Sequence, residues 1–321
     1  MKNTTRRNFL RTSIMGIGAI ALSSVSGGCS QSKPTGAAVE NKPVLPTLPA
    51  NSPYMVIARA GEPEALIQRA MAAFGGMQTF VKKGSNVILK PNVCTAYHSY
   101  EYAATTNPFL VGALVKLCLA AGAKKVTVMD FPFGSTAEEA YAVSGIADQV
   151  KAAGGEMVVM SDFKFVATDI PSGAWLKKTD IYDDILKADV LINVPIAKNH
   201  GLARITMGMK NLLGVVKNRP PLHINLGQNL ADLATRVRPT LTVLDAIRIL
   251  TANGPTGGNL DDVKKLDTVI VSPDYVAVDA YGSTLFGLKP TDLDYVRAGA
   301  KSGFGRADVE NLKIEEINVG A

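Results

Sequence analysis

The stretch SNVILKPNV (residues 85–93), followed by NPFLVGALVKLCLAAGA (107–123) and KKVTVMD (124–130), determines the fold class. The two outer segments are short and rich in apolar β-branched residues, which is typical of strands. The middle segment is a longer apolar run with a glycine stop, which is typical of a helix. Because the strand segments are apolar throughout, we expect both of their faces to be buried. The stretch therefore predicts a parallel or mixed sheet with helices on each side.

Segments of the same two kinds alternate along the rest of the chain. Further strands are expected at 54–60, 155–160, 188–195, 240–250 and 267–273, and further helices at 62–76 and 135–145. Residues 163–182 differ, because apolar and polar residues alternate there and turn residues are frequent, as in a hairpin. We therefore expect residues 54–321 to form a single α/β domain with a mixed, largely parallel sheet, helices on both faces and a β-hairpin insertion.

The first 28 residues have the layout of an export signal. Lys2, Arg6, Arg7 and Arg11 form a positive segment without an acid, and an apolar run from 13 to 25 follows. That run is too short and too rich in Gly and Ser to be a good membrane span. The paired arginines in TTRRNFLR resemble a twin-arginine signal, so residues 1–28 are expected to be read by the twin-arginine export machinery. An ordinary secretory signal is the alternative.

Cys29 follows the apolar run and several small residues, which is the position of a lipidated cysteine. Simple cleavage is the alternative, because Ser26 stands three residues earlier, where an aliphatic residue is usual. Residues 29–53 contain five prolines and almost no large apolar side chain, so they predict a tether. These features predict a protein on the periplasmic side of the cell envelope, anchored to a membrane by a lipid at Cys29.

Charge and cysteine content argue against two classes of function. The first 28 residues carry four of the six net positive charges, so the remainder has a net charge of only +2. We therefore expect no nucleic-acid partner. The chain lacks the four-cysteine pattern of an iron–sulfur cluster. Cys118 lies in an apolar helical run and is expected to be buried, while a disulfide between Cys94 and Cys118 is left open.

Polar residues follow several of the predicted strands. In a parallel sheet the carboxyl ends of the strands meet at one edge, where ligands bind. The residues that we expect at this edge are Lys90, Asn92, Asp130, Lys198, His200 and Asp245.

The stretch VPIAKNHGLARITMGMKNLLG (194–214) gathers basic residues between a strand and a short helix. On that helix Thr206 and Lys210 are four residues apart and share a face. A lysine beside a loop histidine can form an anion pocket or a proton-transfer pair, and such a histidine would titrate near neutral pH. A solvated helix face is the alternative.

Two further segments are candidate parts of this site. The glycine-rich loop NGPTGGN (253–259) could present backbone N–H groups of Asn253, Gly254 and Gly257 to an anion, or it could be a wide turn. Asp279 lies on an apolar helix, where a carboxylate needs a partner, and both Asp279 and Asp245 are expected to pair with cations. His200, His223 and Asp245 could together hold a divalent metal, although their spacing matches no compact metal motif.

These motifs occur in an order that resembles the family described as domain of unknown function 362. The resemblance covers about residues 54–306 and is carried by four motifs: Lys-x-His (198–200), Met-Lys-Asn-Leu-x-Gly (209–214), Asn-Gly-Pro (253–255) and Val-Ala-Val-Asp (276–279). Some members carry ferredoxin-type cysteine clusters, which this chain lacks. The resemblance implies that residues of these motifs form one site, namely Lys198, His200, Lys210, Asn211, Asn253 and Asp279.

Two functions remain open. The first is an exported enzyme that acts on a small anionic substrate, with catalytic residues Lys198, His200, Lys210 and Asp279. Its ligand-binding residues would be Lys90, Asn92, Asp130, Asn211, Asn253, Gly254 and Gly257. The second is a non-catalytic lipoprotein that binds a ligand or metal for a redox partner. The cofactor is left open, with a divalent metal as one candidate.

Overall fold

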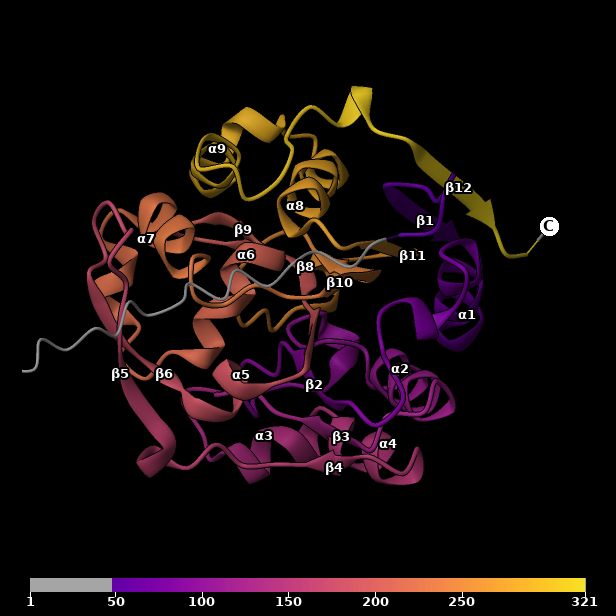
Figure 1. Cartoon of the computed structure of the whole chain (residues 1–321), viewed down its shortest axis with the longest axis horizontal. Coiled ribbons are helices and arrows are strands. Elements are labelled where there is room, and N and C mark those ends of the chain that lie inside the picture. The colour runs from indigo at the N-terminus through magenta and orange to yellow at the C-terminus, as the bar shows by residue number, and fades with distance from the viewer. Residues whose placement is uncertain (1–47, 321) are drawn as a thin grey trace, which may run out of the picture. The chain divides into compact units, whose positions relative to one another are not determined.

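The computed structural model describes residues 48–320, and their main feature is one large mixed sheet (Figure 1). The strand order is β12-β1-β11-β10-β7-β2-β3-β4, and β8 and β9 extend the sheet beside β10. The strands are β1 Met55–Arg59, β2 Asn86–Pro91, β3 Lys125–Val128, β4 Glu156–Met157, β7 Val190–Val194, β8 Ile196–His200, β9 Arg204–Thr206, β10 Leu241–Leu250, β11 Val263–Ser272 and β12 Ile314–Asn318.

Most neighbouring strands are parallel. This holds for β10 with β7, β7 with β2, β2 with β3, β3 with β4 and β1 with β12. Strand β11 runs antiparallel to both of its neighbours, and β9 runs antiparallel to β8. The predicted mixed, largely parallel sheet is confirmed.

Helices cover both faces of the sheet. On one face, an apolar core joins the sheet to α1 (Pro63–Ala73), α2 (Pro108–Ala120), α3 (Ala137–Val143) and α4 (Ile146–Ala152). On the other face, a second core includes α5 (Asp183–Lys187), α6 (Gly208–Asn211), α7 (Leu226–Leu233), α8 (Tyr275–Ser283) and α9 (Asp294–Lys301). Figure 1 shows α7, α8 and α9 on the opposite side of the central strands from α1 and α2.

The start of helix α2, which was predicted from residues 107–123, is explained by local contacts. Asn107 begins α2, because its side chain accepts hydrogen bonds from the backbone N–H groups of Phe109 and Leu110, and Pro108 occupies the first turn. Cys118 is buried, as expected. Cys94 and Cys118 are both free thiols, which settles the open question of a disulfide between them.

The predicted hairpin is present as a separate two-stranded sheet. Strands β5 (Phe165–Asp169) and β6 (Lys178–Tyr182) pair in antiparallel register.

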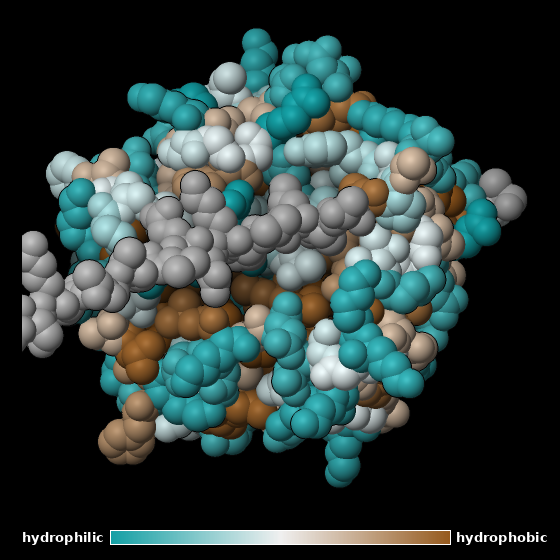
Figure 2. All heavy atoms as spheres, in the orientation of Figure 1, coloured by the Kyte–Doolittle hydropathy of each residue, from teal (hydrophilic) through white to brown (hydrophobic). Residues whose placement is uncertain are grey.

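Figure 2 shows polar side chains over most of the visible face of the molecule, with apolar side chains exposed near its centre. Within residues 48–320, no helix is both long enough and apolar enough to cross a bilayer.

Candidate anion-binding pocket

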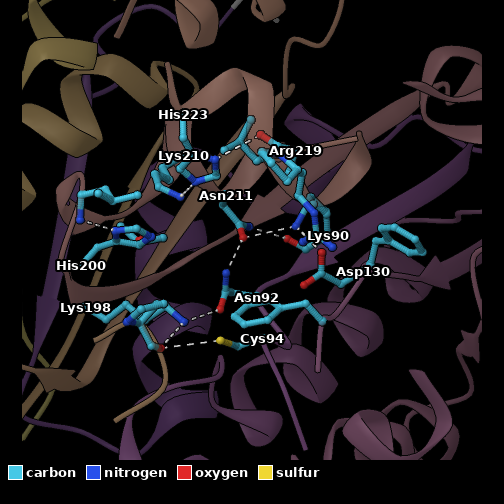
Figure 3. A pocket seen from close by; sticks show the side chains of 18 of the residues that line it. Lys90, Asn92, Cys94, Asp130, Lys198, His200, Lys210, Asn211, Arg219 and His223 are labelled. Atoms are coloured by element: carbon cyan, nitrogen blue, oxygen red, sulfur yellow. Dashed lines mark hydrogen bonds and ion pairs between the residues drawn. The ribbon is translucent and has the colours of Figure 1, made fainter. Parts of the chain in front are cut away.

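A cavity of about 620 Å³ lies where β2, β3 and β8 end, and α6 and the segment after it close its other side (Figure 3). It brings together residues that are far apart in the chain, as the parallel topology predicts. The polar and charged residues that line it are Lys90, Asn92, Cys94, Asp130, Lys198, His200, Thr206, Lys210, Asn211, Lys217, Arg219 and His223. Its apolar lining includes Phe131, Phe133, Leu202, Leu213, Pro220 and Pro255.

Lys90 uses all of its hydrogen-bond donors within the protein. Its Nζ lies 2.6 Å from Asp130 Oδ1, 3.0 Å from the Pro91 carbonyl oxygen and 3.2 Å from Asn211 Oδ1. Because an ammonium group has three N–H donors, none is left for a ligand. Burial lowers the pKa of Lys90, and the neighbouring Asp130 carboxylate opposes this shift. The Lys90–Asp130 pair is therefore a neutral structural unit in the floor of the pocket.

Lys198 is saturated in the same way. Its Nζ donates to Asn92 Oδ1 at 2.9 Å, to the Ala104 carbonyl at 2.6 Å and to the Pro255 carbonyl at 2.9 Å. Asn92 in turn donates to Asn211 Oδ1 at 2.9 Å, which links Lys198 to the Lys90 unit. Lys198 thus contributes positive charge to the pocket but has no free donor.

Lys210 and Arg219 are the cations that can contact a ligand directly. Among residues 48–320, neither forms an ion pair with a carboxylate, and Lys210 Nζ has one weak partner, His223 Nε2 at 3.4 Å. Burial, followed by repulsion from Lys198 and Arg219, lowers the pKa of Lys210 to about 8. The Arg219 guanidinium lies 5.1 Å from the centre of the Phe131 ring and donates one long hydrogen bond, of 3.4 Å, to the Pro132 carbonyl.

The two histidines have tautomers that follow from their hydrogen bonds. His200 Nδ1 accepts from the backbone N–H groups of Leu202 and Ala203, at 3.1 and 3.2 Å, so its proton must be on Nε2. His223 Nδ1 lies 3.1 Å from the Arg219 carbonyl and must donate to it, which leaves Nε2 as an acceptor that faces Lys210.

Both histidines are neutral at neutral pH. Burial, followed by repulsion from Lys210 and Lys198, lowers the pKa of His200 to about 3. Burial and Lys210 also lower the pKa of His223. The prediction that His200 would titrate near neutral pH is therefore wrong, because burial and the neighbouring cations both favour the neutral ring.

Thr206 supplies a further donor. Its side chain lines the cavity and is only 4% exposed, and Oγ1 has no hydrogen-bond partner within the described part of the chain. A buried hydroxyl without a partner is costly, so a ligand atom is the natural partner for it. Thr206 lies at the end of β9, not on the helix with Lys210, but the two side chains do share the pocket wall.

Asp279 does not line this cavity. Its two oxygens accept from the backbone N–H groups of Gly208 and Met209, at 2.5 and 2.8 Å, at the start of α6. Burial raises the pKa of Asp279 to about 8 against the effect of these two donors. The expectation of a cationic partner and of a catalytic role is corrected, because the carboxylate is satisfied by the backbone of the helix that carries Lys210.

Asp245 is also outside the pocket. Strand β10 continues past it to Leu250, so Asp245 lies inside the sheet and not at a strand end. Its carboxylate accepts from the backbone N–H groups of Asn107, at 2.7 Å, and Ile247, at 3.0 Å. Residues 48–320 contain no cluster of three His, Cys, Asp or Glu side chains suited to a metal. His200, His223 and Asp245 therefore do not form the predicted metal-ligand set.

The glycine-rich loop contributes a carbonyl instead of N–H donors. The N–H of Gly254 donates to Asn199 Oδ1 at 3.0 Å, and the N–H of Gly257 donates to the Asn253 carbonyl at 3.1 Å. The Asn253 side chain donates to Asp262. The backbone N–H groups of Gly254 and Gly257 are thus used within the protein, and the Pro255 carbonyl is the part of the loop that holds Lys198.

Sequence reasoning missed six residues of the pocket: Cys94, Phe131, Phe133, Lys217, Arg219 and Pro220. Arg219 had a signal, because it lies in the basic, proline-rich loop that contains His223. Phe131 and Phe133 lie within three residues of Asp130, so the strand-end argument could have been extended to them.

The comparisons with known proteins agree with this arrangement of motifs. The model of the family described as domain of unknown function 362 matches residues 87–284. The chain belongs to this family. The match includes every residue that lines the cavity.

Two similar proteins can be named. A thylakoid-associated protein of Synechocystis, sll1697, is 27% identical over 266 residues, which is 78% of each chain. The solved structure of the lactate racemase apoprotein from Thermoanaerobacterium thermosaccharolyticum is 15% identical, with a TM-score of 0.41. That likeness covers 69% of this chain, and this chain spans only 55% of the racemase chain.

Proposed function

We propose that the pocket binds a small organic anion. The observation that carries this proposal is the pair Lys210 and Arg219, two largely buried cations that have no carboxylate partner within residues 48–320. Lys198 adds a third positive charge nearby. Buried charges without a counter-ion are costly, and an anionic ligand would offset that cost.

The size and lining of the cavity support an organic ligand over an inorganic ion. A volume of about 620 Å³ lies in the range of small-molecule sites. Phe131, Phe133 and Leu213 form apolar walls beside the cations. A ligand that has an anionic group and an apolar part would match both.

Calorimetry on a panel of mono- and dicarboxylates and phosphate esters tests this proposal. For an anion that binds the wild-type protein, Lys210→Ala and Arg219→Ala should each weaken binding about 10- to 150-fold, the value of a lost charge-assisted hydrogen bond of about 1.5–3 kcal/mol. Lys217→Ala is the matched control, because Lys217 also lines the cavity but pairs with Asp162 at 3.6 Å. Equal losses in all three variants, or no anion bound at all, would overturn the proposal.

The contact between Lys210 and His223 favours an enzyme over a non-catalytic ligand carrier. Lys210 has an amine whose pKa is lowered to about 8, and His223 Nε2 is a neutral acceptor beside it. Such a pair can move a proton near physiological pH, which simple binding does not require. An accessory lipoprotein that only delivers a ligand is the second candidate.

We also propose the cellular location. The twin-arginine motif and Cys29 support export by the twin-arginine machinery and a lipid anchor on the periplasmic side of the envelope. Residues 1–47 lie outside the described part of the structure, so this proposal depends on their sequence.

A further inference from the structure

We propose that Lys210 is a nucleophilic amine, which condenses with the carbonyl group of an oxo acid held in the pocket. The inference rests on the proposed anion-binding function and deepens it, because it names the ligand class as a carboxylate that carries an aldehyde or ketone. The product would be an imine between Lys210 Nζ and the carbonyl carbon.

Lys210 differs from the other lysines that line the cavity. Lys90 and Lys198 each donate three hydrogen bonds to the protein, so deprotonation of either would break a contact that holds the pocket together. Lys217 pairs with Asp162. Lys210 is held neither by three hydrogen bonds nor by a carboxylate. Among residues 48–320 its Nζ has one hydrogen-bond neighbour, His223 Nε2 at 3.4 Å. Its lone pair can therefore be directed into the cavity.

The surroundings of Lys210 favour the neutral amine. The cations Lys198 and Arg219 repel an ammonium at this position, and burial acts in the same direction. His223 Nε2 is an unprotonated acceptor that can take the proton, because its Nδ1 proton is committed to the Arg219 carbonyl. At pH 7 about a tenth of Lys210 would be neutral, which is far more than for an ordinary lysine.

The remaining donors suit the two ends of an oxo acid. Among residues 48–320, Arg219 has N–H groups without a partner, and these can bind the carboxylate. Two donors are available to the carbonyl oxygen: Thr206 Oγ1, which has no partner in the described part of the chain, and the Nε2–H group of His200. The rings of His200 and His223 lie stacked with their centres 6.3 Å apart, on the same side as Lys210.

The reaction balances without an oxidant or reductant. The amine lone pair of Lys210 attacks the carbonyl carbon, a C–N bond forms and the carbonyl π bond breaks to give a carbinolamine. A proton from the nitrogen passes to His223, and a proton returns to the carbinolamine oxygen. The C–O bond then breaks, water leaves, and a C=N double bond remains.

Reductive trapping tests this proposal. The full chain is incubated with glyoxylate and cyanoborohydride, and labelled lysines are located by peptide mass spectrometry. We expect Lys210 to be labelled at least tenfold faster than exposed Lys301, and Lys198 and Lys90 to stay unlabelled. Propanal has an aldehyde but no carboxylate, so it should label Lys210 no faster than Lys301. The wild-type chain supplies these internal controls, so the test does not depend on a variant that folds.

Oxalate binding to the wild-type chain separates the inference from the proposed function, because oxalate is an anion without a reactive carbonyl. Lys210→Arg has no nucleophilic amine, so incubation with glyoxylate and cyanoborohydride should leave this position unlabelled. If wild type binds oxalate and glyoxylate leaves Lys210 unlabelled, the imine is wrong and anion binding stands. If neither anion binds, the proposed function fails. Equal labelling of Lys210 by propanal and glyoxylate would overturn the oxo-acid specificity.

Discussion

At the scale of single residues, three lysines in one pocket differ because of their hydrogen-bond partners. Lys90 and Lys198 are surrounded by oxygen acceptors, whereas Lys210 faces a histidine nitrogen and other cations. The first two hold loops together and the third remains chemically available. From their charge alone, all three lysines would be expected to contact a ligand equally well.

Anion binding should depend on pH through Lys210. Below about pH 8 Lys210 is charged in both the free and the bound protein, so affinity should change little. Above pH 8 the free amine is neutral, while a bound anion raises its pKa and favours the ammonium. Binding must then take up a proton, and affinity should fall by up to tenfold per pH unit. Calorimetry in two buffers of different ionisation enthalpy at pH 8.5 should detect up to one proton per ligand.

Lys210→Arg is the control for this pH dependence. Arginine stays protonated across this range, so the variant should bind anions with nearly constant affinity from pH 7 to 9.5. The same decline above pH 8 in the variant would assign the titration to another group.

The sequence identified the residues of the pocket better than their roles. Lys90, Lys198 and His200 could be predicted, because polar residues at the ends of parallel strands converge at one edge. Lys210 could be predicted from the short helix that follows them. The saturation of Lys198 could not, since its partners are backbone carbonyls of Ala104 and Pro255, which any residue type could supply.

At the scale of elements, the short helix α6 determines where Lys210 lies. Asp279 on α8 accepts from the first two N–H groups of α6, and Asn193 on β7 donates to the Gly208 carbonyl at 2.9 Å. Gly208 is required here, because a Cβ atom would lie 2.8 Å from Asp279 Oδ1. A four-residue helix is too short to be stable alone, so these contacts maintain it.

Loss of the Asp279 carboxylate should therefore destabilise the fold. Asp279→Ala leaves two buried N–H groups without acceptors, at about 1–3 kcal/mol each, so we expect the free energy of unfolding to fall by about 2–6 kcal/mol. Asp279→Asn retains one acceptor oxygen and should lose less.

Chemical denaturation monitored by circular dichroism measures both losses, and exposed Asp261→Ala should stay within about 0.5 kcal/mol of wild type. If Asp279→Ala unfolds with the same free energy as wild type but no longer binds the anion, Asp279 acts directly in the site and not through the stability of α6.

The element signals in the sequence were informative where they were local. The hairpin of β5 and β6 and the helix at 108–120 follow from alternation, capping and apolar runs. The place of Asp245 inside the sheet followed from the same local signals, because the strand expected at 240–250 already continues past it, as β10 does. The expectation that Asp245 lies at a strand end was inconsistent with that range.

At the scale of the whole molecule, the class of fold follows from the sequence but the strand order does not. Strands that are apolar throughout and alternate with helices require a sheet covered on both faces. The insertion of antiparallel β11 between β1 and β10 depends on contacts between the two ends of the chain, which no short motif encodes.

The export motif makes a prediction for the intact protein. Changing Arg6 and Arg7 together to Lys should leave the protein in the cytoplasm, because the twin-arginine machinery reads the arginine pair itself. Cell fractionation followed by immunoblotting measures this. An envelope location for the double variant would instead indicate an ordinary secretory signal.

Anchoring should depend on Cys29 alone. Acyl chains on this residue would contribute about 0.8 kcal/mol for each buried CH₂ group, and two or more chains give stable attachment. No helix within residues 48–320 could replace that anchor by crossing the bilayer. Cys29→Ala should therefore move the exported protein from the membrane pellet to the soluble periplasmic fraction. It should leave oxalate binding unchanged, because the pocket residues lie between 90 and 255. Membrane association that survives this substitution would show that an uncleaved signal or a protein partner holds the molecule at the membrane.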